Sequence, residues 1–254
     1  MKIQLLPGGG ANNPKEQYLT SFLINDELAV DAGALPLALS RARQLAIRHI
    51  FITHAHLDHM AGLPLMLDNI FTEMSQTILV YAIEETIEAL HKHIFNNVIW
   101  PDFTSFKNSH DVNLQFQIVT PRQPIKINDL EVIAIPVSHT VPTIGLVIKN
   151  QENAIVISGD TSSTEELWLK ARNLDELTAA FIECSYPNRL SDLASKYGHL
   201  SPQLLFAEYQ KIGKTIPTFA YHIKPAYLEE ITADLQALEN KYILIAEPGQ
   251  DYEV

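Results

Sequence analysis

The chain has 254 residues, enough for one large domain or two small ones. Hydrophobic residues make up 46% and charged residues 19%, which is typical of a globular protein, and the formal net charge is −12. This charge argues against a nucleic-acid polymer as partner, because binding along phosphates needs a basic surface.

The cysteine content and the N-terminal segment bear on the compartment. Cys184 is the only cysteine, so no intrachain disulfide can form, as is usual in a reducing compartment. Pro7 and Gly8 interrupt the N-terminal segment before an apolar leader develops, and no apolar run approaches the ~18 residues that span a bilayer. We therefore expect a cytoplasmic protein with no membrane partner.

The first third of the chain alternates short apolar runs with turn residues, which predicts strands and a Gly- and Asn-rich loop at 7–14. The runs at 18–24 and 27–30 flank Asn25 and Asp26, which predicts a hairpin. Apolar residues at helical spacing predict helices at 35–47, from Asp58 onward and at 84–93. The expected strands are 2–6, 18–24, 27–30, 50–53 and 77–82.

The segment 96–127 is less regular and carries Trp100, Phe103 and Phe106 among polar residues. Aromatic side chains are scarce in disordered segments, so we interpret this stretch as an insertion rather than a linker.

The second half repeats the pattern of the first. Helices are expected at 163–172, 202–212 and 228–238, and strands at 131–137, 144–148, 154–158, 180–183, 218–221 and 242–245. Neither a composition break nor a linker separates the halves. The sequence therefore predicts an α/β fold: a single domain over 1–254 with two β-rich halves flanked by helices, an αββα sandwich.

The most informative stretch follows the strand predicted at 50–53. It places His54, His56, Asp58 and His59 within six residues. Imidazole and carboxylate groups are ligands for borderline metals such as zinc, and an open position on such a metal makes a hydrolytic site. The alternative is a surface cluster of polar side chains without a metal. Four such groups at this spacing favour the metal.

Three more polar residues follow predicted strands: His139, Asp160 and His222. Taken singly, each has a simpler explanation, as a core or capping histidine or as a turn carboxylate. Strand ends at the same edge of a sandwich converge in space. Together with the run at 54–59, these residues are therefore predicted metal ligands.

The pattern His-x-His-x-Asp-His at 54–59, with His139, Gly159-Asp160 and His222, resembles the metallo-β-lactamase superfamily over nearly the whole chain. The resemblance implies a buried supporting carboxylate at Asp31, which would accept a hydrogen bond from a ligating histidine; a simple turn carboxylate is the alternative. It also implies two metals bridged by Asp160, one held by His54, His56 and His139 and the other by Asp58, His59 and His222.

Four further sequence motifs are similar to those of class II 3′,5′-cyclic-nucleotide phosphodiesterases. They are Ile99-Trp100-Pro101, Glu183-Cys184-Ser185-Tyr186-Pro187, Gly198-His199-Leu200 and His222-Ile223-Lys224-Pro225. This resemblance implies hydrolysis of cAMP or cGMP to the nucleoside 5′-monophosphate by a metal-bridging hydroxide, with Asp58 completing the two-metal catalytic site. Glu183 and the pair Gly198-His199 also resemble the phosphodiesterase branches that include tRNase Z, which implies that His199, oriented by Glu183, would protonate the leaving oxygen. The alternative for His199 is a surface residue beside a helix.

Trp100 and Phe103 are candidates for stacking on the purine, with plain packing or dimer contacts as the alternative. The implied cofactors are two divalent metal ions, zinc first, with manganese or iron able to use the same ligands. The implied partner is a small cyclic nucleotide, and a homodimer is left open. Rival functions are a tRNase-Z-like or broad-specificity phosphodiesterase, and a metal-dependent nucleotide-binding protein without catalysis.

Overall fold

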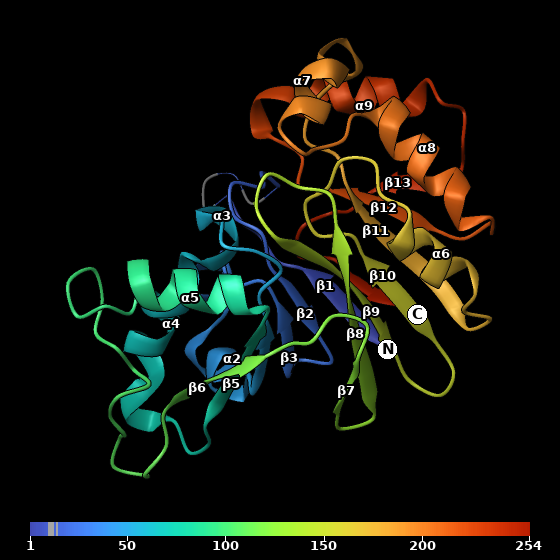
Figure 1. Cartoon of the computed structure of the whole chain (residues 1–254). Coiled ribbons are helices and arrows are strands. Elements are labelled where there is room, and N and C mark those ends of the chain that lie inside the picture. The colour runs from blue at the N-terminus through green and yellow to red at the C-terminus, as the bar shows by residue number, and fades with distance from the viewer. Residues whose placement is uncertain (10–12, 14) are drawn as a thin grey trace.

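The computed structural model describes residues 1–9, 13 and 15–254; positions 10–12 and 14 of the predicted loop at 7–14 lie outside this range. The strands of the described residues form two seven-stranded sheets that pack face to face, with helices on both outer faces (Figure 1). The predicted αββα architecture is confirmed.

The first sheet is built mainly from the N-terminal half. Strands β3, β4, β5 and β6 run parallel, whereas β14, β1, β2 and β3 pair antiparallel. In spatial order the strands are β14 (Asp251–Glu253), β1 (Lys2–Leu5), β2 (Phe22–Ile24), β3 (Leu28–Val30), β4 (His49–Phe51), β5 (Ile78–Ala82) and β6 (Leu114–Ile118).

The second sheet comes from the second half of the chain. Strands β10, β11, β12 and β13 run parallel, and β7, β8, β9 and β10 pair antiparallel. In spatial order they are β13 (Ile243–Ile245), β12 (Thr218–Tyr221), β11 (Leu177–Glu183), β10 (Ala154–Ile157), β9 (Thr143–Lys149), β8 (Leu130–Val137) and β7 (Pro124–Ile127).

Each sheet has its own helical layer (Figure 1). The first is covered by α1 (Leu35–Ala38), α2 (Arg41–Ala46), α3 (Leu57–Met60), α4 (Gly62–Ile70) and α5 (Glu84–His93), and the second by α6 (Glu166–Arg172), α7 (Ser191–Lys196), α8 (Pro202–Ile212) and α9 (Leu228–Gln236). Short 3₁₀ turns occupy Phe71–Glu73, Asn188–Leu190 and Pro225–Tyr227. In the described part of the chain, every helix is too short or too polar to span a bilayer.

The core lies in three layers, one between the sheets and one beneath each set of helices. Phe22 of the first sheet contacts Phe181 and Tyr221 of the second edge-on, with ring centroids 5.3 and 4.9 Å apart. Central strands are buried on both faces, which explains why β10 is an uninterrupted apolar run. This packing fixes the two halves against each other.

Two local differences from the sequence prediction have clear causes. The helix predicted at 35–47 is two helices, because Ser40 is extended (ψ 155°) and its hydroxyl caps α2 by accepting from the Arg43 backbone N–H. The hairpin at Asn25 and Asp26 is confirmed, and both residues have the positive φ of a type I′ turn.

The segment 96–127 contributes the sheet-edge strands β6 and β7, which the sequence pattern did not predict. Its interpretation as an insertion, and the single domain over 1–254, stay predictions. The short helix α7 and strand β14 were also not predicted. β14 pairs with β1, which brings the two chain ends together.

Candidate metal centre

The predicted ligands lie together where strand ends of both sheets meet. His54 and His56 follow β4, Asp58 and His59 are in α3, and the others follow strands of the second sheet. Because parallel strands deliver their carboxyl ends to one edge, residues far apart in sequence converge there. Three sets of residues have potential ligand atoms all within 4.8 Å of one another. The first is His54, His56, His139 and Asp160, here called group one, and the second is Asp58, His59 and His222, here called group two. The third set is Asp160, His199 and His222.

Asp160, a member of group one, also faces the histidines of group two. Its Oδ2 is 3.8 Å from His54 Nε2 in group one, and 3.4 and 3.5 Å from the Nε2 atoms of His59 and His222 in group two. Within group two, His222 Nε2 is 3.1 Å from Asp58 Oδ2. One carboxylate therefore faces histidines of both groups.

The residues present fit bound divalent metal ions. His54 Nε2 and Asp160 Oδ1 are buried and have no hydrogen-bond partner among the described residues, although buried polar atoms are nearly always paired. Burial, with the nearby His59, holds the pKa of His54 well below its usual value, and burial also lowers the pKa of His56 and His139. Neutral imidazoles and carboxylates are the forms that bind zinc and similar metals.

Asp31 supports histidines of both groups from behind. It is buried directly after β3 with φ of 60°, and its Oδ2 accepts from His59 Nδ1 at 2.7 Å. The Thr53 backbone N–H and hydroxyl donate to Asp31, and the same hydroxyl is 3.0 Å from His54 Nδ1. Burial opposes charge on His59, but Asp160 and Asp31 outweigh it and raise the pKa of this imidazole.

His199 and Glu183 form a buried pair beside the groups. His199 Nδ1 donates to Glu183 Oε1 at 2.8 Å, and the His199 ring lies 5.0 Å from that of His139 and 5.6 Å from that of His222. Burial lowers the pKa of His199, but attraction to Glu183 outweighs it and the net pKa is raised. His199 is also close enough to Asp160 and His222 to share a metal with them.

Two backbone contacts that the sequence did not predict hold ligands in place. The Gly198 carbonyl accepts from His139 Nδ1 at 2.7 Å, and a Cβ at Gly198, where φ is +73°, would lie 2.6 Å from that nitrogen. His222 has φ of 60°, and its backbone N–H donates to Gln17 Oε1 at 2.6 Å. A glycine is therefore needed at position 198 because its backbone packs closely against His139 and accepts its hydrogen bond.

The structure does not bring Trp100 and Phe103 into the groups. Phe103 is 4% exposed and packs against Phe71 and Phe106, and Trp100 packs against the same hydrophobic cluster. Their contact with a nucleobase stays a prediction, and the packing alternative accounts for both positions. One aromatic ring beside the site is that of Tyr186, 5.8 Å from the ring of His199 and 5.3 Å from Lys224 Nζ.

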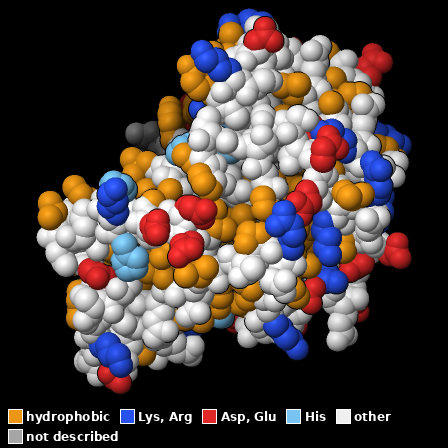
Figure 2. Space-filling view, in the orientation of Figure 1, with side chains coloured by type: hydrophobic (Ala, Val, Ile, Leu, Met, Phe, Trp, Pro, Cys, Tyr) orange, Lys and Arg blue, Asp and Glu red, His pale blue; other side chains and the backbone are white. Residues whose placement is uncertain are grey.

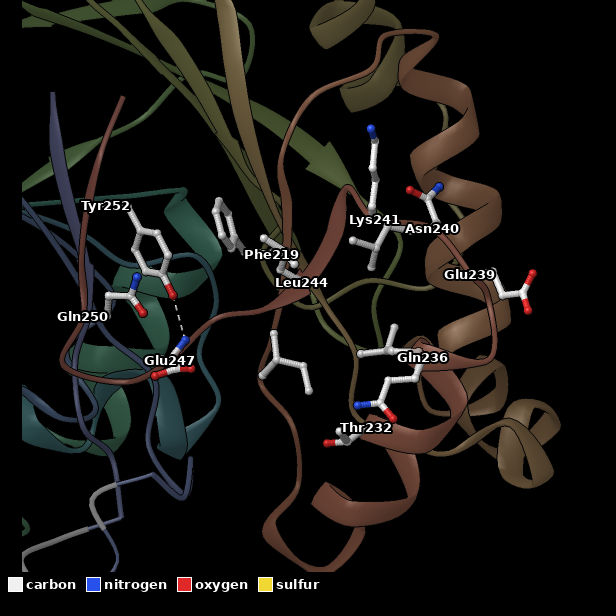
Figure 3. A pocket seen from close by; sticks show the side chains of 13 residues that line it. Phe219, Thr232, Gln236, Glu239, Asn240, Lys241, Leu244, Glu247, Gln250 and Tyr252 are labelled. Atoms are coloured by element: carbon white, nitrogen blue, oxygen red, sulfur yellow. Dashed lines mark hydrogen bonds between the residues drawn. The ribbon is translucent and has the colours of Figure 1, made fainter.

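A separate hollow of about 660 Å³ lies among α9, β13 and β14 (Figure 3). Phe219, Leu244 and Tyr252 are among its apolar lining residues, and Thr232 and Gln236 line it from α9. None of its described lining residues is a histidine. The candidate site is therefore the histidine-rich strand-end cluster and not this hollow.

A model of the β-lactamase superfamily domain matches residues 25–223, which include all seven predicted ligands. The chain belongs to the β-lactamase superfamily. Among curated relatives of this superfamily member is a probable 3′,5′-cyclic-nucleotide phosphodiesterase of Yersinia pestis, 28% identical, with 82% of this chain and 74% of the relative aligned. 3′,5′-Cyclic-nucleotide phosphodiesterase 1 of Saccharomyces cerevisiae is 30% identical, with 66% of this chain and 51% of the relative aligned.

Solved structures agree on the fold of this superfamily member. Unliganded yeast PDE1 superposes with a TM-score of 0.80 at 21% identity, covering 100% of this chain and 99% of that one. The short form of human tRNase Z superposes with a TM-score of 0.72 at 17% identity, covering 100% and 99%. The resemblance to the superfamily, and to its cyclic-nucleotide phosphodiesterases in particular, is confirmed.

Proposed function

We propose that this chain hydrolyses 3′,5′-cyclic nucleotides to nucleoside 5′-monophosphates. The observation that carries the proposal is the His199–Glu183 pair beside the two ligand groups, because it supplies a positioned proton donor next to a site that fits metals. The names of the relatives from Yersinia pestis and Saccharomyces cerevisiae support the substrate class.

Two divalent ions, zinc first and manganese or iron as alternatives, would be held by groups one and two with Asp160 between them. When bound, they would act as Lewis acids toward the phosphodiester and the attacking water. Asp31 keeps His59 oriented by accepting a hydrogen bond from its Nδ1–H, and the Gly198 carbonyl does the same for His139. The chain's own contribution is thus to fix imidazole orientation before any ion or substrate arrives.

His199 would protonate the departing 3′-oxygen. Glu183 holds its Nδ1–H, so Nε2 is the nitrogen left to carry and deliver the second proton. Glu183 accepts in turn from the backbone N–H groups of Thr161 and Leu200, which hold the carboxylate in place. The carboxylate stabilises the protonated imidazole until transfer.

The test is to incubate metal-loaded protein separately with cAMP, cGMP, an aryl phosphodiester and a precursor tRNA, and to identify products by chromatography. Conversion of either cyclic nucleotide to its 5′-monophosphate is the expected result, since cleavage of the P–O3′ bond leaves the phosphate on the 5′-oxygen. Cleavage of the aryl ester alone would replace the proposal with a broad-specificity phosphodiesterase. Tight nucleotide binding without turnover would indicate a binding protein.

A tRNase-Z-like activity is the second candidate. A ribonuclease Z of Methanococcus maripaludis is 33% identical over 110 residues, covering 41% of this chain. The net charge of −12 counts against an RNA polymer as substrate. On the face shown in Figure 2, Lys and Arg side chains are interspersed with Asp and Glu and form no continuous basic surface. Processing of the precursor tRNA would favour this candidate.

A further inference from the structure

Ser185 lies between the candidate proton donor and the candidate metal ligands. It follows β11 by two residues and is fully buried. Its Oγ is 2.8 Å from His222 Nδ1, 3.2 Å from Glu183 Oε2 and 3.3 Å from His199 Nδ1. This hydroxyl is not a predicted metal ligand, yet it lies within hydrogen-bond distance of Glu183, His199 and His222.

The direction of each hydrogen bond follows from the orientation of His222. Its Nε2 faces Asp58 and Asp160 in the ligand cluster, so Nε2 is the nitrogen available to a metal. The ring hydrogen is then on Nδ1, and Ser185 Oγ accepts it. The single hydroxyl hydrogen of Ser185 is left for Glu183 Oε2, or for the His222 carbonyl, which is also 3.2 Å away.

We propose that Ser185 is a positioning residue that links the Glu183 carboxylate to His222. One buried carboxylate then orients two histidines, His199 directly and His222 through the serine hydroxyl. His222 needs this support, because its backbone has a positive φ and its side chain is 6% exposed. Without the hydroxyl, water would have little access to replace the partner of Nδ1.

The consequence for metal binding stands on the ligand geometry, whereas only the consequence for turnover rests on the proposed function. Loss of a partner that holds a ligating histidine typically lowers metal affinity 10–100-fold. Because His222 belongs to group two, the loss should fall on one of two bound ions and leave the other unchanged.

The experiment compares wild type with Ser185→Ala, Ser185→Thr and Ser201→Ala by zinc titration against a chromophoric chelator. Ser201 is an equally buried serine whose hydroxyl, among the residues that the structure describes, hydrogen-bonds Ser191 and no histidine, so its variant is the matched control. We expect Ser185→Ala to weaken one zinc site about 10–100-fold, and Ser185→Thr and Ser201→Ala to bind both ions as wild type does. Unchanged binding in Ser185→Ala, or equal loss in the Ala and Thr variants, would overturn the proposal.

A second readout uses the zinc-loaded wild type and requires no variant to fold. Nitrogen-15 NMR of the imidazoles should place the His222 proton on Nδ1 and show that it exchanges slowly with water. A proton on Nε2 would contradict the link through Ser185. If both readouts agree while wild type cleaves no cyclic nucleotide, the proposed function fails and the positioning role stands. If cyclic nucleotides are cleaved and neither readout agrees, the reverse holds.

Discussion

Each half of the molecule buries one carboxylate behind the histidines, Asp31 in the first and Glu183 in the second. Asp31 bonds His59 directly at 2.7 Å and reaches His54 through the Thr53 hydroxyl. Glu183 bonds His199 directly at 2.8 Å and, in our proposal, reaches a second histidine through a serine hydroxyl. The two halves thus share one arrangement, in which a buried carboxylate positions one histidine directly and a second histidine through a hydroxyl. We call it the carboxylate–hydroxyl arrangement.

The difference lies in what the supported histidines do. Asp31 supports one predicted ligand in each group, His59 and His54, so its effect should be confined to metal binding. Glu183 supports a predicted proton donor, His199, as well as a predicted ligand. In the proposed function, a carboxylate in the same structural setting would therefore serve metal binding in one half and also proton transfer in the other.

The largest expected effect separates these two tasks. His199→Ala should lower turnover of the cyclic nucleotide by about 10²–10⁴-fold while both metals stay bound, because general acid catalysis is lost and the ligands are kept. Steady-state kinetics and metal analysis of the same preparation measure both quantities. His110→Ala, at an exposed histidine, is the control. Loss of a metal from His199→Ala would instead make His199 a ligand together with Asp160 and His222.

Asp31→Asn should affect metal binding in both groups. The amide keeps one acceptor oxygen and puts an NH₂ donor in place of the other, so it cannot accept from Thr53 and His59 as the two carboxylate oxygens do, and each ion should bind about 10–100-fold more weakly. The buried donors left unpaired should also lower the unfolding free energy of the metal-free protein by about 1–3 kcal/mol. Zinc titration and urea unfolding measure the two effects, with the exposed Asp129→Asn as control. Weakening of only one ion would show that Asp31 does not serve both groups.

Thr53→Val should remove only the hydroxyl that links Asp31 to His54 in the carboxylate–hydroxyl arrangement of the first half. Valine has nearly the same shape, so it keeps the packing of this fully buried position while removing the link from Asp31 to His54. We expect one ion, in group one, to bind about tenfold more weakly, and His59 to keep its direct bond to Asp31. Combined with Ser185→Ala, the two losses should appear at different ions and add. If both substitutions weakened the binding of the same ion, the carboxylate–hydroxyl arrangements of the two halves would not be independent.

The sequence predicted what depends on residue type and local pattern. Histidine and aspartate directly after apolar strands point to a metal site wherever the strands meet, and His54, Asp160 and His222 do converge. The positioning hydroxyls of Thr53 and Ser185 could not be predicted, because buried serine and threonine are common and their role depends on partners brought close by folding. Gln17, which holds the backbone of His222, lies 205 residues away from it in sequence.

Aromatic residues show a second limit of the sequence. Composition alone does not reveal which face of a segment is buried, so the packing of Phe103 against Phe71 and Phe106 could not be predicted from the sequence. Likewise, the apolar spacing at 35–47 continues across Ser40, where the backbone turns and a new helix begins. Tertiary packing decides both cases.

The smallest effect is expected at Cys184, which lies between Glu183 and Ser185 but is not predicted to position a histidine. Side chains alternate along extended chain, so Cys184 points away from its neighbours and is buried in the cluster under the helices of the second sheet. Burial raises the pKa of the Cys184 thiol well above its usual value, so the folded protein should not react with iodoacetamide at pH 8 although the unfolded chain should.

The same pKa shift fixes the sign of a pH effect. An unfolded thiol loses its proton above about pH 8.5 while the buried one keeps it, so this group should lower stability as the pH rises further. Cys184→Ala should remove that contribution and leave metal affinity and turnover within about twofold of wild type, because its side chain packs in the apolar cluster under the helices of the second sheet. Unfolding at pH 7 and pH 10 with zinc titration measures both. A large change in metal binding would contradict this prediction. It would mean that Glu183 and Ser185 affect the metal ligands through the packing of this segment and not through their hydrogen bonds to the histidines.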